Sequence, residues 1–284
     1  MRWSDMTTFG NKLVTAQKTN NSWVCIGLDL VMERLPKAVK SSKSPFLAFS
    51  QAIVEATADI ASAYKPNLGF WLTEGPAGLS ALQQLIAGIP KDIPVILDAK
   101  FNDIGNSAKA YARVAFETLG ADAVTVSPYL GRDGVEPFLN YAERGIFLLA
   151  RTSNTSAPDL QNHLVNGHPL YEEVAQLATQ WDADLPGDCG LVAGATYPEE
   201  LARLRQTAPG LPFLIPGIGA QGGSLEAAVA HGLTRTGIGP VINSSRGIIY
   251  AWSSAASSDS DYAEAARTAA IELRNSINRI REEV

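Results

Sequence analysis

The chain has 284 residues, of which 46% are hydrophobic and 18% charged, and its formal net charge at pH 7 is −6. This length and apolar content allow one large α/β domain or two small ones. The acidic balance, without a dense Lys/Arg run, excludes a nucleic-acid-binding stripe, so any anionic ligand requires a local site.

Short apolar runs alternate with amphipathic stretches from end to end, a pattern that predicts alternating strands and helices. The predicted strands are Trp23–Leu28, Tyr64–Phe70, Val95–Asp98, Ala123–Ser127, Ile146–Arg151, Gly190–Gly194, Phe213–Pro216 and a looser one around Thr236–Asn243. The predicted helices are Phe46–Ala61, Gly78–Ala87, Ser107–Leu119, Leu170–Trp181, Pro198–Gln206, Ser224–His231 and a closing helix within Asp259–Glu283.

This alternation predicts a single (β/α)8 TIM barrel over residues 1–284, with an N-terminal extension and a C-terminal closing helix. A doubly wound sheet is the alternative. The barrel is preferred because chemistry-bearing residues follow most of the strands, whereas a wound sheet gathers them at one switch point. No G-x-G-x-x-G follows the first strand, which also argues against a dinucleotide-binding fold.

Cys25 and Cys189 each lie in or beside a strand-like apolar run, which argues against a disulfide framework and for a reducing compartment. Residues 1–12 lack the apolar core of a signal peptide, and no run approaches the length of a membrane span. We therefore expect a cytoplasmic protein without nucleic-acid or membrane partners.

The third predicted strand ends in charged residues rather than in a turn. Asp98 and Lys100 are two positions apart, so on a strand both side chains point to the same side. An acid and a base at the exit of a hydrophobic strand are costly unless they pair or take part in chemistry. Asp103 follows where the next helix should begin and is well placed to cap it. Capping leaves Asp98 and Lys100 unexplained.

This Asp-x-Lys-x-x-Asp-Ile run resembles the signature of the orotidine 5'-monophosphate decarboxylase family, in particular its longer, mycobacterial-like branch. The resemblance implies cofactor-free decarboxylation of orotidine 5'-monophosphate to uridine 5'-monophosphate and CO2. It implies that Lys100 stabilises the carbanion and donates the proton, and that Asp98 lies against the departing carboxylate. Lys65, which opens the second strand, would belong to the same charge network, together with Asp103.

The resemblance also assigns residues to the nucleoside part of the substrate. Asp29, in Gly27-x-Asp29 at the end of the first strand, would contact the ribose hydroxyls. Ser153 is the aligned candidate for the pyrimidine ring, although Thr152 and Thr155 are close enough to leave the register open. The Ser/Thr/Asn/Pro-rich stretch that follows, to about Gly167, is predicted to be a loop and suits a mobile lid.

Two separate segments are expected to bind phosphate. TIM barrels often hold phosphate with backbone N–H groups after strand seven and with residues after strand eight. An arginine guanidinium suits bidentate contact with phosphate. Among the candidates, Gln221 and Arg246 match the family's phosphate-side residues, and Ser245 departs mildly from the glycine often found before that arginine. The phosphate-side candidates are Pro216, Gly217, Gly219, Gln221, Ser245 and Arg246.

The resemblance further implies a homodimer with shared active sites. Asp103 and Ile104 would enter the site of the neighbouring subunit, with a hydroxyl residue four positions after the aspartate. That residue is Ser107, where threonine is usual, so the hydroxyl is kept and the methyl is not.

Two alternatives remain open at this point. The first is a magnesium-dependent sugar-phosphate decarboxylase or aldolase of the same superfamily, and the second is a non-catalytic barrel that binds a nucleotide phosphate. The scattered histidines and the lack of paired His/Cys/Asp spacing predict no metal site. Since no nucleophile–base dyad and no cofactor fingerprint are found either, the chemistry is expected to come from the charged residues Lys65, Asp98, Lys100 and Asp103.

Overall fold

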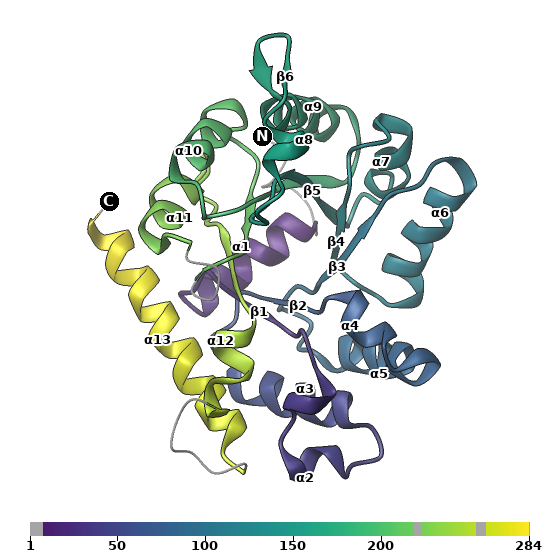
Figure 1. The fold of residues 1–284 in the computed structure, drawn as a ribbon, viewed down its shortest axis with the longest axis vertical. Helices are drawn as coiled ribbons and strands as arrows, with labels where there is room; N and C mark the ends of the chain where they lie inside the picture. Colours follow the sequence, from purple (N-terminus) through teal and green to yellow (C-terminus); the bar gives the residue numbers. More distant parts are fainter. Residues whose placement is uncertain (1–7, 219–222, 254–259, 284) are drawn as a thin grey trace.

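The computed structural model describes residues 8–218, 223–253 and 260–283 (Figure 1). Its main sheet has eight strands in the order β2-β1-β10-β9-β8-β5-β4-β3, and every neighbouring pair along this order is parallel. These strands are β1 (Val24–Gly27), β2 (Ala63–Lys65), β3 (Ile96–Phe101), β4 (Ala123–Val126), β5 (Gly145–Arg151), β8 (Asp188–Ala193), β9 (Phe213–Ile215) and β10 (Val241–Ser244).

The sheet curls until its two edge strands, β2 and β3, meet. Two isolated parallel bridges, Tyr64 with Val95 and Asn67 with Asp98, join them. The backbone N–H of Tyr64 donates to Pro94 O at 3.0 Å, and that of Asp98 donates to Pro66 O at 2.9 Å. The predicted (β/α)8 barrel is therefore confirmed, with the carboxyl ends of all eight strands at one mouth.

Helices surround the strands (Figure 1). The longer ones are α3 (Pro45–Thr57), α5 (Gly75–Gly88), α6 (Gly105–Arg113) with its π-helical continuation (Val114–Thr118), α7 (Arg132–Leu139), α9 (Leu170–Asp184), α10 (Pro198–Thr207), α11 (Leu225–Gly232) and α13 (Tyr262–Glu283). The shorter helices are η1 (Met32–Arg34), α2 (Lys37–Lys40), α4 (Leu68–Leu72), α8 (Pro158–Gln161), α12 (Arg246–Ile249) and η3 (Ala251–Ser253). Within the described ranges, no helix is both long and apolar enough to cross a membrane.

The hydrophobic core has two parts, one between the strands and the outer helices and one inside the barrel. The inner part includes Phe9 and Leu13 from a helix that the sequence did not lead us to expect, α1 (Phe9–Thr19). The Phe9 ring packs edge-on against Phe147 at a centroid distance of 5.7 Å. Because Gly145 and Asp188, the first residues of β5 and β8, contact this end of α1, the helix covers the amino-terminal end of the barrel.

Helix α13 runs along the outside and packs against α3, α11 and α12. The Arg267 guanidinium makes two hydrogen bonds, of 2.6 and 2.8 Å, to the Asp59 carboxylate just after α3. Near the other end of α13, the Arg281 guanidinium lies 4.2 Å from the centroid of the Trp23 ring.

Two expectations about local structure are wrong. The predicted strand Tyr64–Phe70 ends at Lys65, and α4 begins at Leu68 because Asn67 caps it, with Oδ1 accepting the Gly69 N–H at 3.0 Å. The stretch after β5, predicted to be a loop, contains α8 and an antiparallel hairpin of β6 (Leu164–Val165) and β7 (His168–Pro169).

Candidate active site

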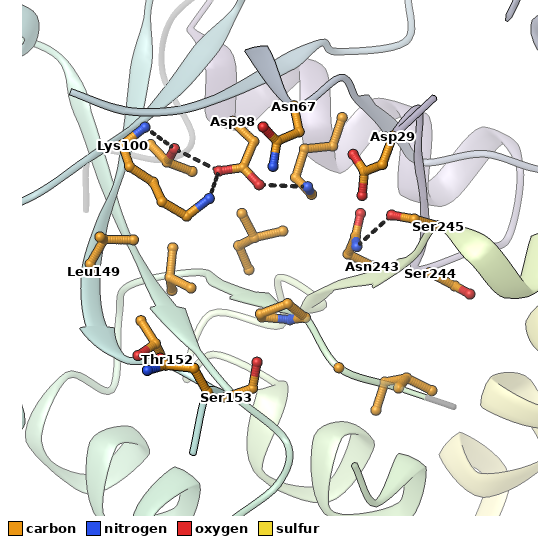
Figure 2. A pocket seen from close by; sticks show the side chains of 18 of the residues that line it. Asp29, Asn67, Asp98, Lys100, Leu149, Thr152, Ser153, Asn243, Ser244 and Ser245 are labelled. Atoms are coloured by element: carbon orange, nitrogen blue, oxygen red, sulfur yellow. Dashed lines mark hydrogen bonds and ion pairs between the residues drawn. The ribbon is translucent and has the colours of Figure 1, made fainter. Parts of the chain in front are cut away.

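A cavity of about 510 Å³ lies at the carboxyl ends of the barrel strands (Figure 2). This volume is within the range of ~300–1,000 Å³ that is typical of small-molecule sites. The cavity collects residues from all eight barrel strands or the segments that follow them. Of the residues named from the sequence, its lining includes Asp29, Lys65, Asp98, Lys100, Ser153, Pro216, Gly217, Ser245 and Arg246.

Asp98, within β3, lies between two lysines. Lys65 Nζ is 2.8 Å from Asp98 Oδ2, and Lys100 Nζ is 2.5 Å from Asp98 Oδ1. The Lys65 side chain is only 4% exposed, whereas that of Lys100 is 47% exposed at the cavity wall. One carboxylate thus holds a buried ammonium on one side and an accessible ammonium on the other.

These contacts fix the charges of the inner pair. Burial of Asp98 opposes its ionisation, but the positive charges of Lys65 and Lys100 hold the pKa of its carboxyl well below the usual range. Burial likewise opposes protonation of Lys65, but the negative charges of Asp98 and Asp29 keep its pKa above the ordinary lysine value. The site therefore contains an ionised carboxylate and a protonated buried lysine throughout the neutral pH range.

The backbone of β3 is irregular where it carries these side chains. Its register against β4 shifts between Leu97 and Phe101, and Lys100 has a φ of +51°, which L-residues other than Asn and Asp seldom adopt. The N–H groups of Ala99 and Lys100 both donate to Thr125 Oγ1 on β4, at 3.0 and 2.9 Å. The Asp98–Lys100 contact was expected from strand alternation, but here it also depends on this bulge.

Asp29 lies in a segment that two aromatic side chains hold in place. Trp71 Nε1 donates to Leu28 O at 3.2 Å, and the hydroxyl of Tyr250 accepts the Val31 N–H at 2.8 Å. Asp29 Oδ1 is buried and has no hydrogen-bond partner among the described residues. Such an acceptor is suited to a hydroxyl group of a bound ligand.

The segment after β5 is anchored by a buried arginine. The Arg151 side chain is 1% exposed, pairs with Glu200 and donates to Thr152 O at 2.8 Å. The Gln161 amide accepts the Thr152 N–H at 2.9 Å and donates to Thr152 Oγ1 at 2.8 Å. Thr152 is therefore held against the α8 side of this segment.

The next residue, Ser153, lines the cavity, across from Asp98 and Lys100 in Figure 2. Thr155 is exposed and is not part of the lining. Thr152 and Ser153 both line the cavity and Thr155 does not, so the choice of Ser153 for the pyrimidine ring stays a prediction.

The predicted phosphate side is only partly described. Pro216 and Gly217 follow β9, and Ser245 and Arg246 follow β10, all in the cavity lining. Arg246 is exposed, and among the described residues no carboxylate pairs with it. Gly219 and Gln221 lie outside the described residues, so their predicted contacts stay predictions.

Asp103, Ile104 and Ser107 do not line this cavity. The N-cap of α6 is Ile104, and Asp103 Oδ1 accepts the N–H of Ile104 itself at 2.8 Å. The predicted capping role of Asp103 is therefore wrong, because the carboxylate turns back to the adjacent amide instead of reaching the first turn of the helix. Ile104 is 52% exposed although it is apolar.

Comparison with known proteins gives a family. Residues 22–259 match the model of the orotidine 5'-phosphate decarboxylase / HUMPS family. A protein from Thermomicrobium roseum, named orotidine 5'-phosphate decarboxylase, is 49% identical over 98% of this chain and 97% of its own length. The chain belongs to this family. The relative of the same name from Herpetosiphon aurantiacus is 47% identical over 92% of this chain and 95% of its own.

A solved structure agrees with this assignment. The structure of Leishmania donovani OMP decarboxylase superposes with a TM-score of 0.82 at 40% identity, covering 96% of this chain and 98% of that one. The resemblance drawn from the Asp-x-Lys-x-x-Asp-Ile run is thereby confirmed at the level of family and fold.

Sequence reasoning missed six polar residues of the cavity: Asn67, Thr125, Asn154, Gln161, Asn243 and Ser244. Asn67 could have been found as a cap residue before an apolar run, but Thr125 lies within an apolar strand and resembles an ordinary β-branched strand residue. In residues 8–218, 223–253 and 260–283, no group of three or more His, Cys, Asp or Glu side chains is placed to hold a metal ion.

Proposed function

We propose that this chain catalyses the decarboxylation of orotidine 5'-monophosphate to uridine 5'-monophosphate and CO2, a step in pyrimidine synthesis. The placement of Asp98 between Lys65 and the accessible Lys100, at the mouth of a barrel of this family, carries the proposal. The names of the relatives support the choice of substrate. No cofactor is invoked.

In the proposed reaction, the bond between ring carbon C6 and the carboxylate breaks and its electron pair stays on C6. The ammonium of Lys100 stabilises that negative charge and then transfers a proton to C6, and solvent returns a proton to the amine. Fixed cations aimed at developing charge act strongly in a site that excludes water. The Lys65–Asp98 pair, with its protonation states fixed by mutual attraction, holds Lys100 in place.

Further residues are assigned by position. Asp29, with its unpaired buried oxygen, would accept hydrogen bonds from the ribose hydroxyls, and Ser153 would contact the pyrimidine ring. Arg246 would pair with the phosphate, aided by Pro216, Gly217 and Ser245 from the cavity lining and by Gly219 and Gln221. Binding energy from the remote phosphate can then be used to assemble the reacting end of the site.

The direct test is the loss of orotidine 5'-monophosphate absorbance on addition of purified protein treated with a chelator. Turnover that does not depend on added magnesium supports the proposal. No turnover of orotidine 5'-monophosphate, with magnesium-dependent turnover of a sugar phosphate, would instead favour the sugar-phosphate branch of the superfamily. Ligand binding without turnover would indicate a non-catalytic barrel.

We also propose a homodimer in which Asp103, Ile104 and Ser107 complete the partner's site. These three residues lie outside the cavity of their own subunit, and Ile104 is exposed. Leu130 is 40% exposed and lies close to Asp103. A Cβ built on Gly134 would be 3.0 Å from Asp103 O and 3.5 Å from Leu130 Cβ. Exposed apolar side chains that form one patch with a polar rim are a mark of a surface that another chain covers. A cytoplasmic location is supported by two buried cysteines that form no disulfide.

A further inference from the structure

Thr125 lies at the middle of β4, beside the bulge of β3, and its side chain is 1% exposed. Its hydroxyl accepts hydrogen bonds from the backbone N–H groups of Ala99 and Lys100. It donates a hydrogen bond of 3.0 Å to Asp98 Oδ1, the same oxygen that Lys100 Nζ contacts. One hydroxyl therefore contacts three consecutive residues of β3, at the point where the two charged side chains of that strand meet.

The hydrogen bonds of Thr125 allow only one orientation of its hydroxyl. A hydroxyl oxygen has two lone pairs and one hydrogen. The amides of Ala99 and Lys100 occupy both lone pairs, so the hydrogen points to the Asp98 carboxylate. An ionised carboxylate, held between two ammonium groups, is well suited to accept this hydrogen bond.

The bulge leaves the Ala99 and Lys100 amides without a regular strand partner, and Thr125 supplies one for both. Lys100 has a positive φ there, a strained conformation for a residue with a Cβ. Such a conformation persists only when its surroundings determine it. The hydroxyl thus fixes the backbone from which the Lys100 side chain extends and the carboxylate that its ammonium contacts.

We infer that Thr125 is a positioning residue for the proposed decarboxylation, on whose correctness this inference rests. It acts through Asp98 and Lys100 and does not itself take part in proton transfer. Its substitution should therefore lower kcat while leaving KM and the affinity for uridine 5'-monophosphate nearly unchanged, because the phosphate and ribose contacts lie elsewhere in the cavity. A displacement of ~1 Å at reacting groups costs on the order of 100-fold in rate.

The test compares Thr125→Val, which keeps the shape and removes the hydroxyl, with Thr125→Ser, which keeps the hydroxyl. Thr57→Val is the matched control: Thr57 is also fully buried and its hydroxyl donates to Ile53 O at 2.6 Å, but it lies on α3 outside the barrel. We expect Thr125→Val to lose ~100-fold in kcat, Thr125→Ser to recover most of that loss, and Thr57→Val to change only the thermal unfolding midpoint. If Thr125→Val fails to fold, Thr125→Ala takes its place.

A second readout does not depend on activity. Amide hydrogen exchange at Ala99 and Lys100 should be slow in the wild type and in Thr125→Ser, and fast in Thr125→Val. If the wild type does not decarboxylate orotidine 5'-monophosphate, the proposed function is wrong, and the exchange data alone decide whether Thr125 positions the bulge. Wild-type kcat in Thr125→Val, equal damage in Thr125→Ser, or unchanged exchange at both amides would each overturn the inference.

Discussion

The side chain of Ser245, which follows β10, fills the space next to Gly27 at the end of β1. A Cβ built on Gly27 would collide with Ser245 Oγ, would lie 2.8 Å from Ser245 Cβ and would lie 3.2 Å from Asn243 Oδ1. Two barrel strands that are neighbours in the sheet therefore share one small volume beneath the predicted phosphate side. A side chain at position 27 can therefore be accommodated only if Ser245 moves or is replaced by a smaller residue.

This relationship predicts a graded rescue. Gly27→Ala alone should destabilise the fold by ~1–3 kcal/mol, the usual cost of overpacking. Adding Ser245→Ala removes the hydroxyl clash but leaves the Cβ contact, and adding Ser245→Gly removes both. In chemical denaturation, Gly27→Ala should therefore be the least stable variant, Gly27→Ala with Ser245→Ala should be more stable, and Gly27→Ala with Ser245→Gly should be the most stable. Equal stabilities would contradict this prediction.

Lys100→Ala should abolish decarboxylation and leave the fold and the affinity for uridine 5'-monophosphate largely intact. The reason is that Lys100 provides the accessible ammonium next to Asp98. Single-turnover absorbance measurements would check the activity and calorimetry the affinity. Lys91→Ala, which removes an exposed lysine near the amino-terminal end of β3, is the control for loss of one charge. Near-normal turnover in Lys100→Ala would refute the mechanism.

Arg246→Ala should chiefly weaken nucleotide binding, by ~10–100-fold, the usual effect of losing a hydrogen bond to a charged group. Its proposed contact is with a phosphate remote from the reacting carbon. Arg235→Ala, on an exposed turn before β10, is the charge-matched control. The phosphate-free nucleoside should react equally poorly with the wild type and Arg246→Ala, and slower reaction with the mutant would show that Arg246 has been misassigned.

Subunit mixing tests the shared active site. Lys100→Ala and Asp103→Ala are each expected to be inactive, but a mixed dimer would have one site with both lesions and one with neither. Random pairing at equal concentrations makes about half of the dimers mixed, so roughly a quarter of all sites should regain wild-type composition. If subunit exchange is verified, for instance with differently tagged chains, and activity does not return, the shared site is wrong.

Asp188 predicts a pH dependence of stability at the other end of the barrel. Its Oδ2 accepts the Gly10 N–H at 2.8 Å, and burial raises the pKa of its carboxyl to about 6, with Asp182 nearby adding to the rise. The unfolded carboxyl titrates near ~3.9. Between these values the native state binds more protons, so this group's contribution to stability falls as pH rises from ~4 to ~6 and is constant above.

Asp188→Asn should remove that dependence, since an amide oxygen can accept from Gly10 without ionising. The difference in unfolding free energy between the wild type and the variant should change by on the order of 2–3 kcal/mol from pH 4 to pH 6, in favour of the variant at the higher pH. Urea unfolding across that range measures it. A difference that is constant with pH would show that Asp188 does not titrate there.

The sequence predicted the barrel because each buried strand is a short apolar run between amphipathic stretches, a pattern that does not depend on long-range contacts. It also placed Asp98 beside Lys100, because their spacing gives them the same side of a strand. The bulge that sets their geometry could not be predicted, because it depends on Thr125, 25 residues away from Lys100 on the next strand.

Helix α1 was missed for a related reason. Its buried face, which includes Phe9, Leu13 and Ala16, is short and is interrupted by polar residues such as Asn11 and Lys12. What stabilises the helix is its seat against the starts of β5 and β8, where the Gly10 N–H meets the Asp188 carboxylate. Contacts between segments more than 130 residues apart leave no local signal.

The two bridges between β2 and β3 give the barrel a seam, and the Lys65–Asp98 ion pair crosses it. The ion pair of the proposed active site and the closure of the barrel therefore depend on the same contact between β2 and β3. Because isolated bridges join β2 and β3, where neighbouring pairs such as β4 and β5 form a continuous ladder, we expect heating to widen this seam and separate the two charges before the outer helices lose their packing. On heating, the enzyme should lose activity while its circular dichroism still shows intact helices. Substitutions that strengthen the contact between β2 and β3 should raise the temperature at which activity is lost more than substitutions that stabilise a helix.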